Sequence, residues 1–234
     1  MFLKLFLSTL LLTGPEPAPA PPESGSDEAY FCAVEGMTLN YERRNEKSGV
    51  FWWRQTTHID SAVRNGDGTI DIDFSTTVQP VEKSFPVDGP VKGKTVILPS
   101  GTIQIDLTSS LLSVAHQLAS GLNFKVEGGI AEIGADIAPG DTLKDLHTVM
   151  SWHAFSYFVD ITKRLVLRRE RISVPAGTFD CIVIQEQKVE RRPFYKRKNI
   201  SITWYAKGYG AIRRDSLKMD GTLEASELLV SYTQ

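Results

Sequence analysis

Hydrophobic and polar residues alternate along most of the chain, and turn-forming residues interrupt the alternation roughly every 8 to 14 residues. Between residues 69 and 78, for example, Ile70 and Ile72 alternate with Asp71 and Asp73. A period of two places one set of side chains on each face of a β-strand. The sequence therefore predicts a mainly β protein built as an antiparallel meander.

The clearest strand and turn signals lie in the C-terminal part of the chain. Pro175 fixes φ at the second position of a type I turn, and Gly177 fits the fourth position. The stretch before them, residues 148–167, is rich in strand formers, with a break predicted near Asp160. Five antiparallel strands are predicted in series, at residues 164–173, 178–189, 199–206, 211–217 and 222–232.

One segment departs from the strand period. In residues 109–121, Leu111, Val114, Ala115 and Leu118 fall on one face of a helix. Serine at the start of the segment can cap such a helix, and glycine at its end can terminate it. The sequence therefore predicts one short amphipathic helix that lies across the sheet.

The N-terminus has the pattern of a secretory signal peptide. Lys4 precedes the apolar run Leu5–Leu12, and residues 18–20 (Ala-Pro-Ala) have the small-x-small form of a cleavage site. The apolar run is far shorter than the roughly 20 residues that span a bilayer. A buried N-terminal strand is the alternative, which the Pro-rich stretch that follows disfavours. We therefore expect an exported protein with a signal peptide at 1–20, a flexible leader at 21–29 and a single β domain at 30–234.

The chain has two cysteines, Cys32 and Cys181. In an oxidising compartment an even number of cysteines permits a disulfide. Such a bond would close a loop of about 150 residues and stabilise the fold by up to about 4 to 5 kcal/mol. The alternative is two buried free thiols that act as small apolar side chains. The sequence leaves both alternatives open.

Two turn segments carry a family resemblance: Val-Pro-Ala-Gly-Thr-Phe-Asp-Cys at residues 174–181 and Trp-Tyr-Ala-Lys-Gly-Tyr-Gly at residues 204–210. On these residues the chain resembles the uncharacterised exported proteins of Bacteroidetes called TapB-like. The resemblance implies a single curved antiparallel sheet or incomplete barrel, similar to lipoprotein-carrier and lipocalin-like folds. It supplies no catalytic residues. Further matches lie at residues 30–41, 105–112, 126–128 and 139–143.

Positive charge is concentrated toward the C-terminus. The whole chain has a net charge of −2, but residues 163–218 carry 15 Lys and Arg against 5 Asp and Glu. Within this region the predicted basic loop at residues 191–198 combines cations with aromatic residues. Four of its cations are candidates for an interaction surface: Arg191, Arg192, Lys196 and Arg197. In an exported protein such a loop is typical of a surface that contacts an envelope protein, an anionic lipid or a polysaccharide, and not nucleic acid. The alternative is a solvated hairpin end.

The sequence contains no recognisable catalytic or cofactor-binding motif. It lacks a nucleophile elbow, a phosphate-binding loop, a zinc-protease helix and a Cys-x-x-Cys pair. His147 and His153 lie near acidic residues, but the pattern supplies no third metal ligand. The protein is therefore predicted not to be an enzyme and to need no cofactor or metal.

Aromatic residues on predicted strands are the better lead. Five are candidates to line an apolar groove in a half-closed barrel: Trp52, Trp53, Trp152, Phe155 and Tyr157. The alternative is that they fill the core. Because side chains alternate along a strand, Trp52 and Trp53 are expected on opposite faces.

The leading functional hypothesis is a periplasmic or envelope-associated protein that binds a lipid-like or other apolar ligand without catalysis. Its basis is the implied half-barrel together with the aromatic strands. The alternative hypothesis is a structural or protein-interaction module that uses the basic loop. Neither hypothesis includes a transmembrane segment.

Overall fold

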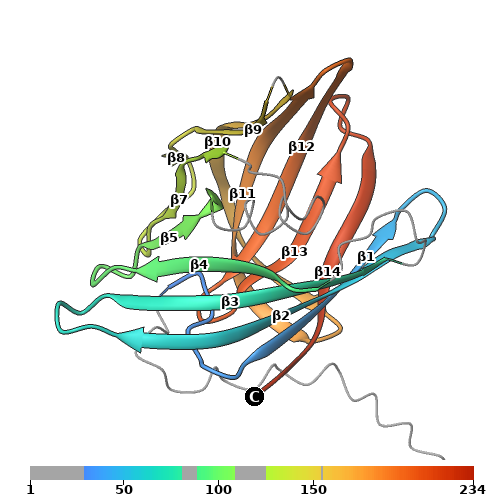
Figure 1. The fold of residues 1–234 in the computed structure, drawn as a ribbon. Helices are drawn as coiled ribbons and strands as arrows, with labels where there is room; N and C mark the ends of the chain where they lie inside the picture. Colours follow the sequence, from blue (N-terminus) through green and yellow to red (C-terminus); the bar gives the residue numbers. More distant parts are fainter. Residues whose placement is uncertain (1–28, 81–88, 109–124, 154) are drawn as a thin grey trace, which may run out of the picture.

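β-Strands make up most of the regular structure (Figure 1). The computed structural model describes residues 29–80, 89–108, 125–153 and 155–234. In this part of the chain no helix has the length and apolarity needed to cross a membrane. The described strands are β1 Thr38–Asn45, β2 Phe51–Arg64, β3 Ile70–Pro80, β4 Val91–Ile97, β5 Ile103–Asp106, β6 Lys125–Glu127, β7 Ile130–Ile133, β8 Thr142–Leu143, β9 Leu146–Trp152, β10 Phe155–Val174, β11 Gly177–Arg192, β12 Tyr195–Ala206, β13 Gly210–Leu217 and β14 Leu223–Thr233.

The described strands belong to one antiparallel sheet. Hydrogen-bonded neighbours follow the order β6-β9-β10-β11-β12-β13-β14-β1-β2-β3-β4-β5-β7, and β8 pairs with β10. The sheet curves strongly, and its end strands β6 and β7 do not pair with each other, so it remains open (Figure 1). This confirms the predicted mainly β fold with one curved sheet. The predicted helix at residues 109–121 and the predicted signal peptide lie outside the described residues.

The five predicted C-terminal strands correspond to β10 through β14. The break predicted near Asp160 is wrong, because β10 runs without interruption through this position. A β-bulge lies instead between Thr162 and Leu165, where Lys163 has a φ of 52°. A bulge bends a strand and raises its twist without ending the pairing. The long strand can therefore follow the curvature of the sheet.

The segment that precedes β1 closes one end of the curved sheet. The backbone N–H of Gly208, in the β12–β13 turn, donates to the carbonyl of Ala29 at 2.8 Å. The N–H of Gly36 donates to a carbonyl of β2 at 3.0 Å. The ring of Phe31 lies 5.6 Å from the ring of Phe74 on β3. The segment thus connects the two halves of the curved sheet, one of which contains β12 and β13 and the other β2 and β3.

Aliphatic side chains from both halves of the sheet form one core. Burying each such side chain contributes about 1.5 to 3 kcal/mol. Gly93 on β4 leaves room for Phe74, because a Cβ atom at this glycine would lie 2.3 Å from the phenylalanine ring. Side chains therefore fill part of the space between the two halves. The largest fully buried residues are Ile59, Ile72, Ile103, Ile133, Ile182, Ile184, Ile212 and Leu229.

Both cysteines are buried free thiols in the structure. This arrangement corresponds to the thiol alternative and not to the disulfide. The Sγ atom of Cys181, on β11, donates to the carbonyl of Phe179 at 3.8 Å. Burial raises the pKa of the Cys181 thiol to about 12 and also raises the pKa of Cys32. The reactive thiolate form is therefore disfavoured at neutral pH.

Candidate functional site

Two neighbouring hairpins extend from the end of the sheet opposite the segment that precedes β1 (Figure 1). One joins β9 to β10, and the other joins β11 to β12. Phe158 of β10 pairs with Arg191 of β11, so the two hairpins lie side by side. We call residues 155–158 and 191–198 the hairpin end. It contains two of the predicted aromatic residues and all four predicted basic residues.

The predicted basic loop is shorter than expected. β11 extends to Arg192 and β12 begins at Tyr195, so only Pro193 and Phe194 form the turn. Pairing of β11 with β12 continues to the last residue on each side of this turn. The cations are therefore held on a two-stranded ribbon, which fixes their spacing better than a loop would.

Large aromatic side chains are exposed at the hairpin end. Phe194 has a relative accessible surface of 109%, and Phe155, Phe158 and Tyr195 are also exposed. Phe194 follows Pro193 in the turn and has a φ of 62°. Proline at the second position and a positive φ at the third position are the marks of a type II turn, which normally carries glycine or asparagine at the third position. A phenylalanine there is strained.

Positively charged side chains surround these rings. The guanidinium carbon of Arg192 lies 4.5 Å from the centre of the Tyr195 ring, and that of Arg191 lies 5.6 Å from the Phe158 ring. Arg191 also forms an ion pair with Asp160 at 2.5 Å. Arg197 pairs with Glu224 at 3.2 Å. In the described part of the chain, no ion pair includes the three remaining cations Arg192, Lys196 and Lys198.

A shallow hollow of about 510 Å³ lies between the two hairpins and is lined in part by Phe158, Arg191 and Pro193. Tyr157 is half-buried on the same strand as Phe158. Burial, together with the neighbouring Glu190 carboxylate, raises the pKa of Tyr157 to about 12. Its hydroxyl therefore stays protonated and neutral at physiological pH.

Trp152 and the candidate histidines are dispersed along β9 and its turn. The Trp152 ring contacts the ring of His153 edge-on at 5.0 Å. The Nδ1 atom of His147 lies 3.0 Å from a carboxylate oxygen of Asp160. Among the described residues, no group of three or more His, Cys, Asp or Glu side chains is placed to hold a metal ion. No ring contact in this part joins the hairpin end to the tryptophan pair of β2.

Two cross-strand rows of side chains run across seven strands of the sheet. Directly paired residues of antiparallel strands share a face, and the next row along the strands faces the other way. One row, the Arg43 row, contains Val166, Ile184, Thr203, Arg214, Glu227, Arg43 and Trp53. The neighbouring row, the Trp204 row, contains Arg168, Val183, Trp204, Arg213, Leu228, Glu42 and Arg54.

The Arg43 row is the more deeply buried of the two. Five of its members are buried, whereas Arg168 and Arg54 at the ends of the Trp204 row are exposed. In the Trp204 row only Val183 and Trp204 are buried. On β1, Tyr41 shares the face of Arg43 and is a core residue. The Arg43 row therefore lies on the concave face of the sheet, and the Trp204 row lies on the convex face.

The prediction that Trp52 and Trp53 point to opposite faces is wrong. Arg43 pairs with Trp53, but Arg44 pairs with Phe51, so Trp52 is the extra residue of a β-bulge. A bulge interrupts the strict alternation of side chains. The two indole rings stack with their centres 5.9 Å apart. They therefore form one aromatic surface beside Arg43.

Glu227 organises the polar part of the Arg43 row. It is 5% exposed and accepts hydrogen bonds from Arg214 at 2.8 Å and from the Trp53 indole at 3.3 Å. The attraction of the Glu227 carboxylate raises the pKa of the Arg214 guanidinium. This pair gives the row one hydrogen-bonded ion pair, with a buried carboxylate and a partly exposed guanidinium.

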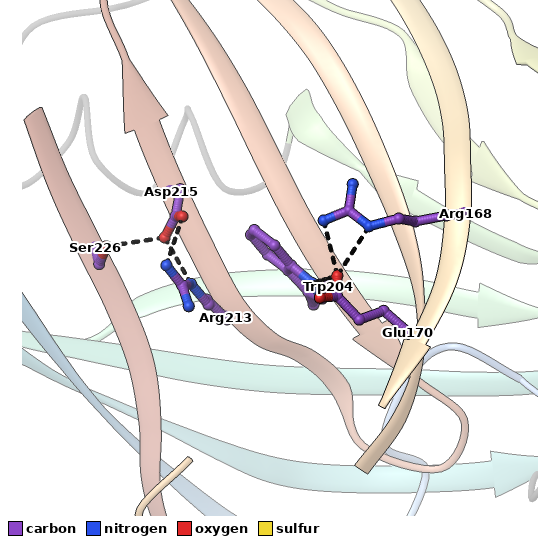
Figure 2. A network of polar contacts seen from close by, with 6 residues as sticks. All are labelled: Arg168, Glu170, Trp204, Arg213, Asp215 and Ser226. Atoms are coloured by element: carbon purple, nitrogen blue, oxygen red, sulfur yellow. Dashed lines mark hydrogen bonds and ion pairs between the residues drawn. The ribbon is translucent and has the colours of Figure 1, made fainter. Parts of the chain in front are cut away.

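A second polar network, the Trp204 cluster, lies on the convex face (Figure 2). The indole of Trp204 donates to Glu170 at 2.8 Å, and the guanidinium carbons of Arg213 and Arg168 lie 4.8 and 6.0 Å from its ring. Arg213 pairs with Asp215 through two hydrogen bonds of 2.9 and 2.8 Å. Trp204 begins the segment 204–210 that carries the family resemblance, and it is 6% exposed. Its charged partners come from distant strands and carried no local signal.

Comparisons with known proteins identify a family and a fold. A family model described as DUF3108-like matches residues 94–229. The expected name TapB-like is not confirmed by these comparisons. No curated protein matches the chain.

Two solved structures are similar over most of their length. One, from Bacteroides fragilis, is provisionally described as an exported protein with a YmcC-like fold; it is 14% identical with a TM-score of 0.69, and the match covers 87% of this chain and 98% of that one. The other, from Parabacteroides distasonis, is provisionally described as a lipoprotein; it is 15% identical with a TM-score of 0.69, and the match covers 88% and 98%. At this identity the likeness establishes the fold.

Proposed function

The chain belongs to the DUF3108-like family, and on that premise we propose an exported, non-enzymatic protein of the cell envelope that binds anionic lipid surfaces through the hairpin end. Export is supported by the signal-peptide pattern of residues 1–20. It is also supported by the two structural neighbours, which are described as an exported protein and a lipoprotein. The lipid preference is argued from the side chains of the hairpin end.

Phe194 is the observation that carries the proposal. Its ring is fully exposed, and its backbone has a positive φ that glycine would adopt without strain. Both properties disfavour phenylalanine in an isolated protein. Strain of this kind, about 1 to 3 kcal/mol for a non-glycine residue, concentrates at functional positions. A partner that buries the ring offsets the cost.

The cations around Phe194 favour an anionic lipid surface as that partner. Each Lys or Arg near an anionic membrane contributes about 1 kcal/mol of attraction. Aromatic rings lie well at the membrane interface, where an apolar body meets polar head groups. Arg192, Lys196 and Lys198 have no ion pair within the described residues, so their charge is available to head groups.

Co-sedimentation with lipid vesicles tests the proposal. The purified mature protein should bind vesicles that contain phosphatidylglycerol and should bind pure phosphatidylcholine vesicles weakly. Phe194→Gly should lower the binding without lowering the melting temperature, since glycine suits the turn. Substituting Arg192, Lys196 and Lys198 together by glutamine should remove about 3 kcal/mol of the attraction.

The matched control is Val63→Ala. Val63 is a large exposed apolar residue, 53% exposed, on β2 and outside the hairpin end. Its substitution should leave vesicle binding unchanged. The proposal fails if the wild-type protein ignores anionic vesicles or if Phe194→Gly binds as well as wild type. Loss of an envelope-protein partner by the glutamine variant, without any vesicle binding, would favour the interaction-module alternative instead.

A second candidate function, binding of one lipid-like molecule on the concave face, is favoured by a separate observation at Arg43. The tryptophan pair of β2 lies beside it. Both tryptophans are only partly buried, whereas side chains fill the core between the two halves of the sheet.

A further inference from the structure

Arg43 is a buried cation with an unused hydrogen-bond donor. The residue is 8% exposed, and one terminal nitrogen donates to the hydroxyl of Ser216 at 2.6 Å. Its Nε atom is buried and has no hydrogen-bond partner among the described residues. The guanidinium carbon lies 5.0 Å from the centre of the Trp53 ring and 5.8 Å from that of Trp52. Aromatic rings therefore flank a guanidinium that is only partly satisfied.

The polar part of the Arg43 row carries excess positive charge. Arg214 and Glu227 form an ion pair at 2.8 Å, and the Trp53 indole occupies the other carboxylate oxygen at 3.3 Å. No ion pair within the described residues includes Arg43. The row thus holds two guanidinium groups and one carboxylate. One negative charge is missing.

An unpaired buried charge is unfavourable unless an anion joins it. Burial lowers the pKa of the Arg43 guanidinium, yet an arginine side chain remains protonated in a protein. A buried polar donor without a partner also costs free energy. The planar guanidinium presents its N–H groups in a fixed fork that matches the oxygens of a carboxylate or phosphate.

We propose that Arg43 binds the oxyanion head group, a carboxylate or a phosphate, of a lipid-like ligand whose apolar chain lies against Trp52 and Trp53. Both tryptophans are only partly buried, so they offer apolar surface to a ligand. The site lies on the concave face and uses none of the residues of the hairpin end. It therefore stands independently of the proposed membrane-surface binding.

Isothermal titration calorimetry with four probes tests the head-group requirement. Dodecanoate and dodecyl phosphate carry the two candidate head groups, dodecanol carries only the chain, and inorganic phosphate carries only the charge. We expect at least one of the two charged amphiphiles to bind about tenfold or more tightly than dodecanol and inorganic phosphate. The tighter of the two identifies the head group. Equal binding of dodecanol, or no binding of either charged amphiphile, overturns the proposal.

Arg43→Gln links the binding to this side chain. The variant should lose about 30-fold or more in affinity for the preferred probe, because it removes one partner of a buried charge pair. Arg54→Gln is the matched control. Arg54 belongs to the Trp204 row, with a side chain that is 66% exposed and pairs with Glu42 at 3.3 Å. A normal affinity of Arg43→Gln, or an equal loss in Arg54→Gln, overturns the proposal.

Thermal unfolding without ligand separates binding from a structural role. Arg43→Met removes the unpaired charge and keeps much of the side-chain volume. If Arg43 is kept for an anion, the ligand-free variant should melt at the same temperature as wild type or higher. A clear fall in melting temperature shows that Arg43 supports the fold through Ser216, and it contradicts the proposal. Added dodecanoate or dodecyl phosphate, whichever binds tighter, should raise the melting temperature of wild type but not of the variant.

Discussion

The two faces of the sheet use the same residue types with different results. The Trp204 cluster and the Arg43 row each combine two arginines with tryptophan. On the convex face Arg168 pairs with Glu170 at 2.8 Å, and Arg213 pairs with Asp215 at 2.8 Å. In the Arg43 row, among the described residues, only Arg214 has a carboxylate within ion-pair distance. One cluster is balanced in charge, and the other is not.

This difference shows how a structural cluster is distinguished from a binding site. In the Trp204 cluster the indole donates to Glu170, and a serine of β14 donates to Asp215 at 2.9 Å. Each charge has a partner from the chain itself, so the cluster needs nothing from outside. At Arg43 the described residues supply a hydroxyl and two aromatic rings, and the neighbouring Glu227 carboxylate is paired with Arg214 instead. Burial without a counter-charge indicates a place for a ligand.

The largest expected effect belongs to the balanced cluster. Trp204→Ala should lower the free energy of unfolding by about 3 to 5 kcal/mol, because it removes a buried aromatic side chain. The loss also exposes Val183, its neighbour on β11, which is fully buried in wild type. Urea denaturation monitored by circular dichroism gives the value.

Trp152→Ala serves as the comparison for that measurement. Trp152 is only half-buried and lies near one edge of the sheet, on β9. Trp152→Ala should therefore lower the free energy of unfolding by less than half as much as Trp204→Ala does. Similar losses for the two variants would mean that the Trp204 cluster is no more than ordinary surface packing.

The same substitution should destabilise the protein at Arg213 and not at Arg43. Arg213→Met leaves Asp215 without its ion pair, although that side chain is only 8% exposed. Because Arg213 itself is partly exposed, the expected loss is about 2 kcal/mol, below the full cost of breaking a buried pair. Arg43→Met leaves no carboxylate unpaired. Equal destabilisation of the two variants in urea denaturation would remove the distinction between the clusters.

Much of the fold was predictable because strands and turns depend on neighbouring residues. The Pro175 and Gly177 signal marks the β10–β11 turn, where Gly177 has a φ of 139°. Alternation between Ile70, Ile72 and their aspartate neighbours identified β3. The basic residues of the hairpin end were also predicted, since their charge is visible in the sequence alone.

The rows across the sheet were not predictable because they depend on register between distant strands. Arg43 and Ser216 are 173 residues apart in the sequence, yet they are hydrogen-bonded. The β-bulge at Trp52 changed the face on which its ring lies, and the local sequence carries no signal that predicts this bulge. The left-handed backbone of Phe194 is also a property of the folded turn. The charge pattern of the sequence therefore located candidate site residues more reliably than the alternation of side chains along strands did.

The smallest expected effect is a pH dependence confined to the Trp204 cluster. The indole hydrogen bond from Trp204, assisted by Arg168, holds the pKa of Glu170 below its usual value. A carboxylate with a lowered folded-state pKa contributes stability above its unfolded value of about 4.3, and that contribution is lost as the pH falls further. Glu170→Gln should therefore be less stable than wild type at neutral pH, and the difference should shrink on acidification to about pH 3.

Urea denaturation of wild type and Glu170→Gln across this pH range measures the difference in stability. A second variant, Trp204→Phe, removes the indole donor while keeping a buried ring. The difference in the free energy of unfolding between Trp204→Phe and wild type should narrow in the same acidic range. The reason is that the hydrogen bond missing from the variant is made by the charged form of Glu170. Parallel stability curves for wild type and both variants would show that Glu170 is merely solvated. The convex cluster would then owe its stability to ring burial alone, and charge balance would no longer separate it from the Arg43 row.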